Sequence, residues 1–186
     1  MDERKWIERI LAGDTQSFSC LVAKYEKMAY TIALRILENR EEAEEAVQDA
    51  FVKMYRALSD FHFDSKFSTW FYRIVYRTAL TALRQRMFVS YEEAGPVDLS
   101  NDEVESATAL LEREDRKEMI ARTLKKLPAD EALLLTLYYL EECSVEEICQ
   151  ITELSASNVK VKLFRGRKRF YEVLQDKMKL ETADLL

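Results

Sequence analysis

Residues that support tight turns are scarce in this chain. Its 186 residues include only three glycines and two prolines. Sandwiches, barrels and folds with glycine-rich nucleotide loops need such residues at their many turns. The sequence is instead rich in glutamate, lysine, leucine and alanine, which favour helices. The expected fold class is therefore all-α.

Two segments with helical apolar periodicity flank one that lacks it. The first segment shows the 3.6-residue period over 2–37, with a break at Gly13-Asp14, and again over 41–58 and 68–87. Residues 89–111 contain Gly95-Pro96, many acidic and serine residues and few large apolar ones, which is typical of a linker. We expect two small helical domains, at 1–88 and 112–186, joined by a flexible acidic linker at 89–111.

The composition also argues against membrane insertion and against catalysis. No apolar run approaches the roughly 20 residues that span a bilayer, and the charged N-terminus lacks the apolar core of a signal peptide, so a cytoplasmic location is expected. The chain has one histidine, His62, three cysteines without a CxxC pair, and no glycine-rich phosphate loop. We therefore expect no enzyme activity, no cofactor and no metal site.

The charge is unevenly distributed along the chain. The formal net charge is −6, yet residues 155–179 hold eight basic and two acidic residues, and 62–87 hold five basic and one acidic. Between them, 128–154 hold seven acidic residues and no basic ones. Two basic blocks favour a nucleic-acid partner, although a solvated helix face is the simpler explanation of either block.

The C-terminal segment has the pattern of a helix-turn-helix. Ser144 and Glu147 have the spacing of a capping box and precede a short helix at 145–152, a tight turn, and a long basic helix at 156–179. On the long helix, spacings of 4, 3 and 4 place Val159, Leu163, Gly166 and Phe170 on one expected buried face.

The opposite face of the long helix combines an aromatic ring with cations. It presents Ser157, Lys160, Val161, Phe164, Arg165 and Lys168. A ring can pack on a thymine methyl group in the major groove and arginine can pair with guanine, while Arg167 and Arg169 suit phosphates. The alternative is a solvated basic helix whose Phe164 lies in a domain contact.

A second candidate site combines aromatic and basic residues at 59–87. The expected loop at 59–68 holds Phe61, Phe63 and Phe67, and the helix after it places Arg73, Arg77 and Arg84 on one face beside Trp70. Stacked bases and a cation-lined backbone are typical of single-strand binding. Each of the aromatic residues could equally be a core residue.

Three stretches carry a more specific pattern. They are AEEAVQDAFVKMYRAL at 43–58, FHFDSKFSTWFYRIVYRTALTALRQ at 61–85 and LKKLPADEALLLTLYYLEECSVEEICQITELSASNVKVKLFRGRKRF at 124–170. In this order and separation they resemble the polymerase-binding helix, the promoter-melting segment and the helix-turn-helix of extracytoplasmic-function (ECF) sigma factors. These are two-domain bacterial initiation subunits of RNA polymerase.

The resemblance implies partners and roles for individual residues. The implied partners are core RNA polymerase, promoter DNA and an anti-sigma factor. Expected polymerase-binding residues are Glu45, Gln48, Asp49, Val52 and Arg56. Expected minus-ten contacts are Phe61, Phe63, Asp64, Ser65, Lys66, Phe67, Trp70, Arg73, Tyr76 and Arg77. Expected minus-thirty-five contacts are Ser157, Asn158, Lys160, Val161, Phe164, Arg165, Arg167, Lys168 and Arg169.

The chain departs from the family pattern at a few positions. Arg77 and Thr81 replace residues that are often Asn and Asp, so the minus-ten sequence is left open. Glu153 occupies a turn position that is often glycine, and must either adopt an unusual backbone angle or shift the turn. The helix-turn-helix alone also fits a repressor or activator that acts without polymerase.

Overall fold

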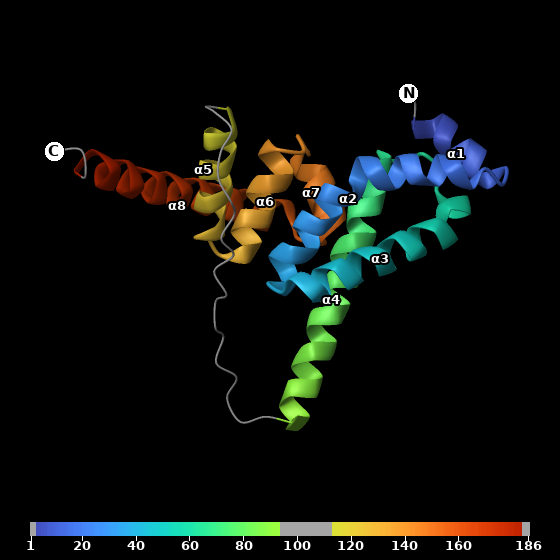
Figure 1. Cartoon of the computed structure of the whole chain (residues 1–186), viewed down its shortest axis with the longest axis horizontal. Coiled ribbons are helices and arrows are strands. Elements are labelled where there is room, and N and C mark those ends of the chain that lie inside the picture. Colours follow the sequence, from blue (N-terminus) through green and yellow to red (C-terminus); the bar gives the residue numbers. More distant parts are fainter. Residues whose placement is uncertain (1–2, 94–112, 184–186) are drawn as a thin grey trace.

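The computed structural model describes residues 3–93 and 113–183, and within them it contains helices and no strand (Figure 1). The all-α expectation is confirmed. The elements are α1 Glu3–Leu11, α2 Thr15–Leu37, α3 Arg40–Arg56, a 3-10 turn at Leu58–Asp60, α4 Phe67–Glu93, α5 Arg113–Lys125, α6 Ala129–Tyr139, α7 Val145–Thr152 and α8 Ala156–Ala183. α4 extends into the segment expected as a linker, of which residues 94–111 lie outside the described part of the chain.

Side-chain caps fix where several helices begin. The Asp14 carboxylate accepts a hydrogen bond from the Gln16 amide at 3.0 Å. Asp14 thereby caps the N-terminus of α2, directly after the break that follows α1. The Asn39 side chain caps α3 in the same way, through the Glu42 amide at 3.0 Å. Ser144 and Glu147 form the expected capping box at the start of α7.

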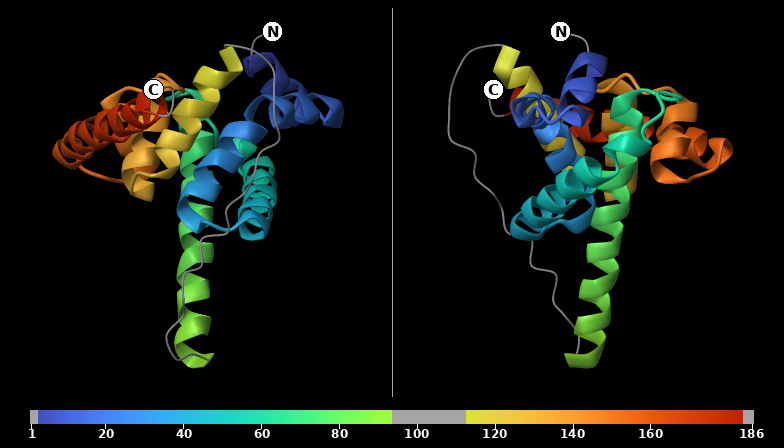
Figure 2. Two further views of the ribbon diagram at one scale, coloured as in Figure 1. Left: turned by 60° about the vertical axis from the view of Figure 1, so that its left-hand side comes forward. Right: turned by 90° about the vertical axis from the view of Figure 1, so that its right-hand side faces the viewer.

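α2, α3 and α4 pack together around an apolar core, with α1 against α2. Ile32, Met54 and Phe71 are among the side chains that lie fully inside it. Arg86, near the exposed end of α4, donates to the Leu37 carbonyl and to the Glu42 carboxylate, both at 3.0 Å. One side chain thus connects the end of α2 and the start of α3 to α4. The C-terminal part of α4 projects from the rest of the structure in every view (Figure 2).

The C-terminal helices form the helix-turn-helix, with α6 packed against α8 and α7 between them in the chain. Leu137, Ile148 and Val159 are fully buried between these helices. Gly166 makes the close approach of α8 to α6 possible. A Cβ atom at this glycine would lie 3.2 Å from the Leu135 side chain and 3.3 Å from the Glu131 side chain.

The two sets of helices also contact each other, α7 against α4 and α6 against α2. The partly buried Arg35 guanidinium of α2 donates to the Leu124 carbonyl near the end of α5 at 3.3 Å. Burial lowers the pKa of Arg35. The helix-turn-helix is therefore placed directly beside the promoter-melting segment predicted from the sequence.

Candidate nucleic-acid interface

α8 presents the outward face that its periodicity predicts. Val159, Leu163 and Gly166 are buried against the neighbouring helices. The expected minus-thirty-five residues are all exposed, namely Ser157, Asn158, Lys160, Val161, Phe164, Arg165, Arg167, Lys168 and Arg169. The Phe164 ring is 65% exposed. It packs in no domain contact within the described residues, which leaves it free for a partner.

α6 holds three of the α8 cations. The Arg169 guanidinium donates to the Glu131 carboxylate at 2.8 Å, Lys162 pairs with Asp130, and Arg167 donates to the Tyr139 hydroxyl at 3.3 Å. Neither Tyr139 nor Glu131 is predicted to contact α8, because a contact between two helices leaves no local pattern in the sequence.

Glu131 makes the Arg169 pair different from the other two. Glu131 is buried, and its second carboxylate oxygen accepts no hydrogen bond from any residue that the structure describes. A buried carboxylate needs its cation. Arg169 therefore has a structural partner already, and its phosphate contact stays a prediction.

The turn between α7 and α8 adopts the unusual backbone angle expected without glycine. Glu153 has φ +62°, in the left-handed region, and its amide donates to the Cys149 carbonyl at 2.8 Å. The turn therefore keeps the geometry of the motif and does not shift. An L-residue with a Cβ atom is strained in this conformation.

Replacing Glu153 by glycine is expected to raise the free energy of unfolding by up to about 1 kcal/mol, because glycine adopts the left-handed angle without strain. Glu153 also forms an exposed ion pair with Arg77, and the loss of this pair costs less than that. Urea unfolding followed by circular dichroism measures the change. The matched control is Glu153→Gln, which loses the charge but keeps the Cβ atom. A glycine variant no more stable than the glutamine variant would show that the turn is unstrained.

The aromatic loop before α4 is more buried than base capture requires. Phe61 and Phe67 have only 7% and 3% of their surfaces exposed, and their rings pack against Trp70 at centroid distances of 5.1 and 5.6 Å. In this structure both rings therefore belong to the core, which is the alternative that the sequence left open. Their contact with a base stays a prediction. Phe63 is exposed at φ +61°, and the Arg4 guanidinium lies 4.8 Å from the centre of its ring.

The other members of the expected minus-ten set lie on the loop and on α4. Asp64, Lys66 and Arg77 are exposed, whereas Ser65, Trp70, Arg73 and Tyr76 are half-buried. Burial raises the pKa of Tyr76, and the nearby Glu153 and Asp130 carboxylates raise it further. The two exposed cations are paired with carboxylates of α7 and of the turn after it, Lys66 with Glu147 and Arg77 with Glu153.

α3 presents the expected polymerase-binding residues on its solvent side. Glu45, Gln48, Asp49, Val52 and Arg56 are all exposed, and 47% of the Val52 surface is accessible although its side chain is apolar. A groove runs between α3 and α4. It is lined by Glu42, Glu45, Ala46, Asp49, Lys53, Thr78, Thr81, Ala82, Gln85 and Arg86. An acidic rim beside exposed apolar surface is suited to docking a protein partner.

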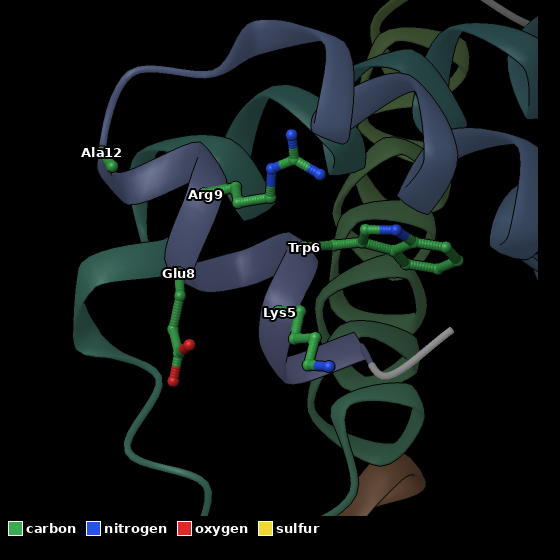
Figure 3. A pocket seen from close by; sticks show the side chains of 5 residues that line it. All are labelled: Lys5, Trp6, Glu8, Arg9 and Ala12. Atoms are coloured by element: carbon green, nitrogen blue, oxygen red, sulfur yellow. The ribbon is translucent and has the colours of Figure 1, made fainter.

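A second hollow lies on α1, lined by Lys5, Trp6, Glu8, Arg9 and Ala12 (Figure 3). Its lining comes from α1 and the residue after it alone, so it lacks the opposing wall of a ligand site, and we assign it no ligand. Among the helices that the structure describes, none has the length and apolar character needed to cross a membrane.

Models of known protein families match two segments of the chain. The family model of sigma-70 region 2 matches residues 21–88, and that of sigma-70 region 4 matches 117–170. The RNA polymerase sigma-H factor of Pseudomonas aeruginosa is 32% identical over 93% of this chain and 94% of its own length. The ECF RNA polymerase sigma-E factor of Escherichia coli is 31% identical over 87% of this chain and 88% of its own length.

Solved structures share the fold. CnrH, solved in complex with the cytosolic domain of CnrY, aligns with a TM-score of 0.62 at 22% identity, over 94% of this chain and 97% of its own. The sigma factor RpoE of Bartonella quintana, solved with the anti-sigma factor NepR, aligns with a TM-score of 0.69 at 20% identity, over 87% and 98%. With both regions matched in order and relatives covering nearly the full length, the chain belongs to the sigma-70 family of RNA polymerase sigma factors, and within it to the ECF group.

Proposed function

We propose that this chain binds core RNA polymerase, directs it to promoters with a minus-thirty-five and a minus-ten element, and assists opening of the duplex. The observation that carries this is the separation of three surfaces on one chain: the solvent side of α3, the basic and aromatic side of α4, and the outward face of α8. It acts by binding and catalyses no reaction of its own, in the cytoplasm where the polymerase works.

The residue roles follow from these surfaces. Phe164 and Arg165 lie exposed on α8, where they can enter a major groove. Trp70 and Arg73 on α4 combine a ring for stacking with a cation for the backbone of an opened strand. Glu45, Asp49 and Val52 on α3 would dock on the polymerase.

Partners of the two solved relatives suggest a regulator. Each relative was solved as a complex, CnrH with a domain of CnrY and RpoE with the anti-sigma factor NepR. We propose that an anti-sigma factor also binds this chain. Copurification of the tagged chain from its own cells, followed by identification of the bound protein, tests this.

Transcription with purified components tests the function as a whole. The chain is mixed with core polymerase and genomic DNA, and the transcript starts are mapped. Starts that share two upstream elements support the proposal. Strong binding of the chain alone to duplex DNA, with no transcripts when core is added, would instead identify a repressor or activator that acts without polymerase.

Trp70→Ala is expected to impair promoter opening more than promoter binding, because the half-buried ring lies beside the cations that would follow the strand. Permanganate reactivity of promoter thymines should fall at least fivefold, in line with stacking worth about 1–3 kcal/mol per base. Duplex binding by the holoenzyme should change less than twofold. Trp6→Ala removes another half-buried tryptophan, on α1 (Figure 3), and should leave both measurements unchanged. Equal loss of opening and binding with a large drop in melting temperature would show that Trp70 serves only the core.

A further inference from the structure

α1 lies against the start of the promoter-melting segment, although none of its residues is among the contacts expected from the sequence. Ile7 and Ile10 of α1 are buried, and α1 contacts both α2 and the 3-10 turn before the aromatic loop. The Glu3 carboxylate accepts a hydrogen bond from the Tyr25 hydroxyl of α2. The Tyr25 ring in turn packs on Phe67 at a centroid distance of 5.3 Å. α1 is therefore held in a defined position beside the loop.

Phe63 is the aromatic residue of the loop that meets α1. It is 40% exposed, and its φ of +61° is one that an aromatic residue rarely adopts. Backbone strain of this kind persists where the surrounding structure holds it, and it is concentrated at binding sites. The Arg4 guanidinium of α1 lies over the Phe63 ring, 4.8 Å from its centre. The loop thus presents an exposed ring in a strained conformation, with a cation of α1 against it.

Phe63 and Arg4 continue a row of aromatic groups that begins on α4. The Phe61 ring lies 5.1 Å from Trp70 and 4.8 Å from Phe63. Only one ring therefore separates Phe63 from Trp70, the residue expected to stack on an opened strand. Exposure rises along the row, from buried Phe61 to exposed Phe63 and Arg4. A strand that continues from Trp70 along this row meets a further ring and a further cation.

Glu8 pairs with Arg4 in a way that a phosphate group can replace. The Arg4 Nε atom donates to the Glu8 carboxylate, one helical turn further on, at 3.2 Å. The two side chains are 64% and 60% exposed, so the pair contributes little to stability and is screened by salt. The planar guanidinium matches the geometry of a phosphate as well as that of a carboxylate. A phosphate can therefore take the place of Glu8 on this cation.

Building on the function proposed above, we propose that Arg4 and Phe63 together form a further subsite for the opened strand. One unpaired base stacks on the exposed part of the Phe63 ring, and the phosphate beside that base pairs with the Arg4 guanidinium. Single-stranded DNA fits this pair because each nucleotide offers a flat base and a negative charge. α1 thereby becomes part of a strand-binding surface that otherwise consists of the loop and α4.

The test uses holoenzyme made from core polymerase and the full chain. Its ligand is a fork-shaped promoter DNA whose minus-ten element is single-stranded and carries the sequence found by transcript mapping. Arg4→Ala removes the cation, and Phe63→Gly removes the ring. Glycine adopts the left-handed angle without strain, so the melting temperature of the Phe63→Gly variant should fall by no more than about 2 °C.

Arg9→Ala is the matched control. Arg9 is also an arginine of α1, its side chain is 62% exposed, and it forms an ion pair, with Asp14 at 3.2 Å. It lies about 140° away from Arg4 around the helix. The control therefore removes the same charge from the same helix but leaves the Phe63 ring and its cation in place.

Arg4→Ala and Phe63→Gly should each weaken binding of the fork DNA at least fivefold. Arg4→Ala should also lower the salt slope by about one, whereas Phe63→Gly should leave the slope unchanged. Affinity of the control for the fork DNA, and affinity of all variants for core polymerase, should stay within about twofold of the wild type. An affinity of Arg4→Ala for the fork DNA equal to that of the control would overturn the subsite.

Altered DNA identifies the nucleotide that the subsite holds. Removing one base at a time from the minus-ten strand should, at one position, weaken wild-type binding at least fivefold and leave Phe63→Gly unaffected. An uncharged methylphosphonate linkage beside that position should weaken the wild type and leave Arg4→Ala unaffected. If no position behaves in this way, the pair holds no nucleotide and the subsite is overturned.

The wild-type holoenzyme tests the proposed function separately. If it binds the fork DNA and starts transcripts while Arg4→Ala matches the control, the subsite alone is wrong. If the wild type fails to bind core or starts no transcripts, the proposed function is wrong, and the subsite with it.

Discussion

Asp49→Arg combined with Val52→Glu should reduce binding to core RNA polymerase by at least 100-fold. Both side chains lie on the solvent side of α3, next to the groove between α3 and α4. The substitutions reverse one charge and place another where apolar surface would be buried. Unpaired charge at the centre of an interface costs several kcal/mol. Binding is measured by competition with a labelled sigma factor for core.

The same variant should fold normally, because exposed positions contribute little to the core. Its free energy of unfolding should change by no more than about 0.5 kcal/mol. Glu26→Arg with Leu11→Glu serves as the control, since it makes the same types of change at exposed positions on α2 and α1. Wild-type affinity of the α3 variant for core would mean that the polymerase docks elsewhere on this chain.

Arg165→Ala should remove base preference at one position of the minus-thirty-five element. Arg165 is exposed beside Phe164 on the outward face of α8, where a bidentate contact with guanine is worth about 1–3 kcal/mol of discrimination. Affinity for the preferred promoter should fall about 5- to 150-fold, while affinity for a promoter changed at that base pair should hardly fall. Holoenzyme binding to a set of single-base promoter variants measures this.

Lys168 provides the comparison for a contact that does not discriminate among bases. Its exposed ammonium lies 3.9 Å from Glu172, so Lys168→Ala leaves no buried charge behind. Binding should weaken about equally on all promoter variants, with the salt slope lowered by about one. Arg169 is unsuitable for this purpose because its loss would leave Glu131 unpaired. A uniform loss in the Arg165 variant would mean that α8 does not enter the groove as proposed.

The sequence was sufficient to predict the helices because local signals and apolar periodicity agree along most of the chain. Ser144 and Glu147 form the capping box that their spacing predicts, and Val159 and Leu163 are buried at the predicted spacing. These features depend on neighbours within a few residues, so no knowledge of the tertiary structure is needed to find them.

Contacts between distant segments could not be predicted in this way. Nothing near Glu147 in the sequence indicates that it pairs with Lys66, because the pairing depends on how two domains pack. The aromatic loop shows the same limit. Phe61 and Phe67 have a sequence pattern that fits a base-binding site as well as a core, and only the packing of their rings on Trp70 favours the core. Where the role of a residue depends on whether its side chain is buried, the resemblance alone therefore predicts a site residue without deciding between binding and core packing.

The pair formed by Glu131 and Arg169 constrains which substitutions this helix-turn-helix can accept during evolution. Loss of Arg169 leaves a buried carboxylate without its cation, and loss of Glu131 leaves a gap against Leu135 and Gly166. Either single change is unfavourable, whereas replacing both residues by apolar ones of similar volume can be neutral. The two positions therefore form an epistatic pair. Descendants of this chain should retain both residues or exchange both, even though they lie 38 residues apart.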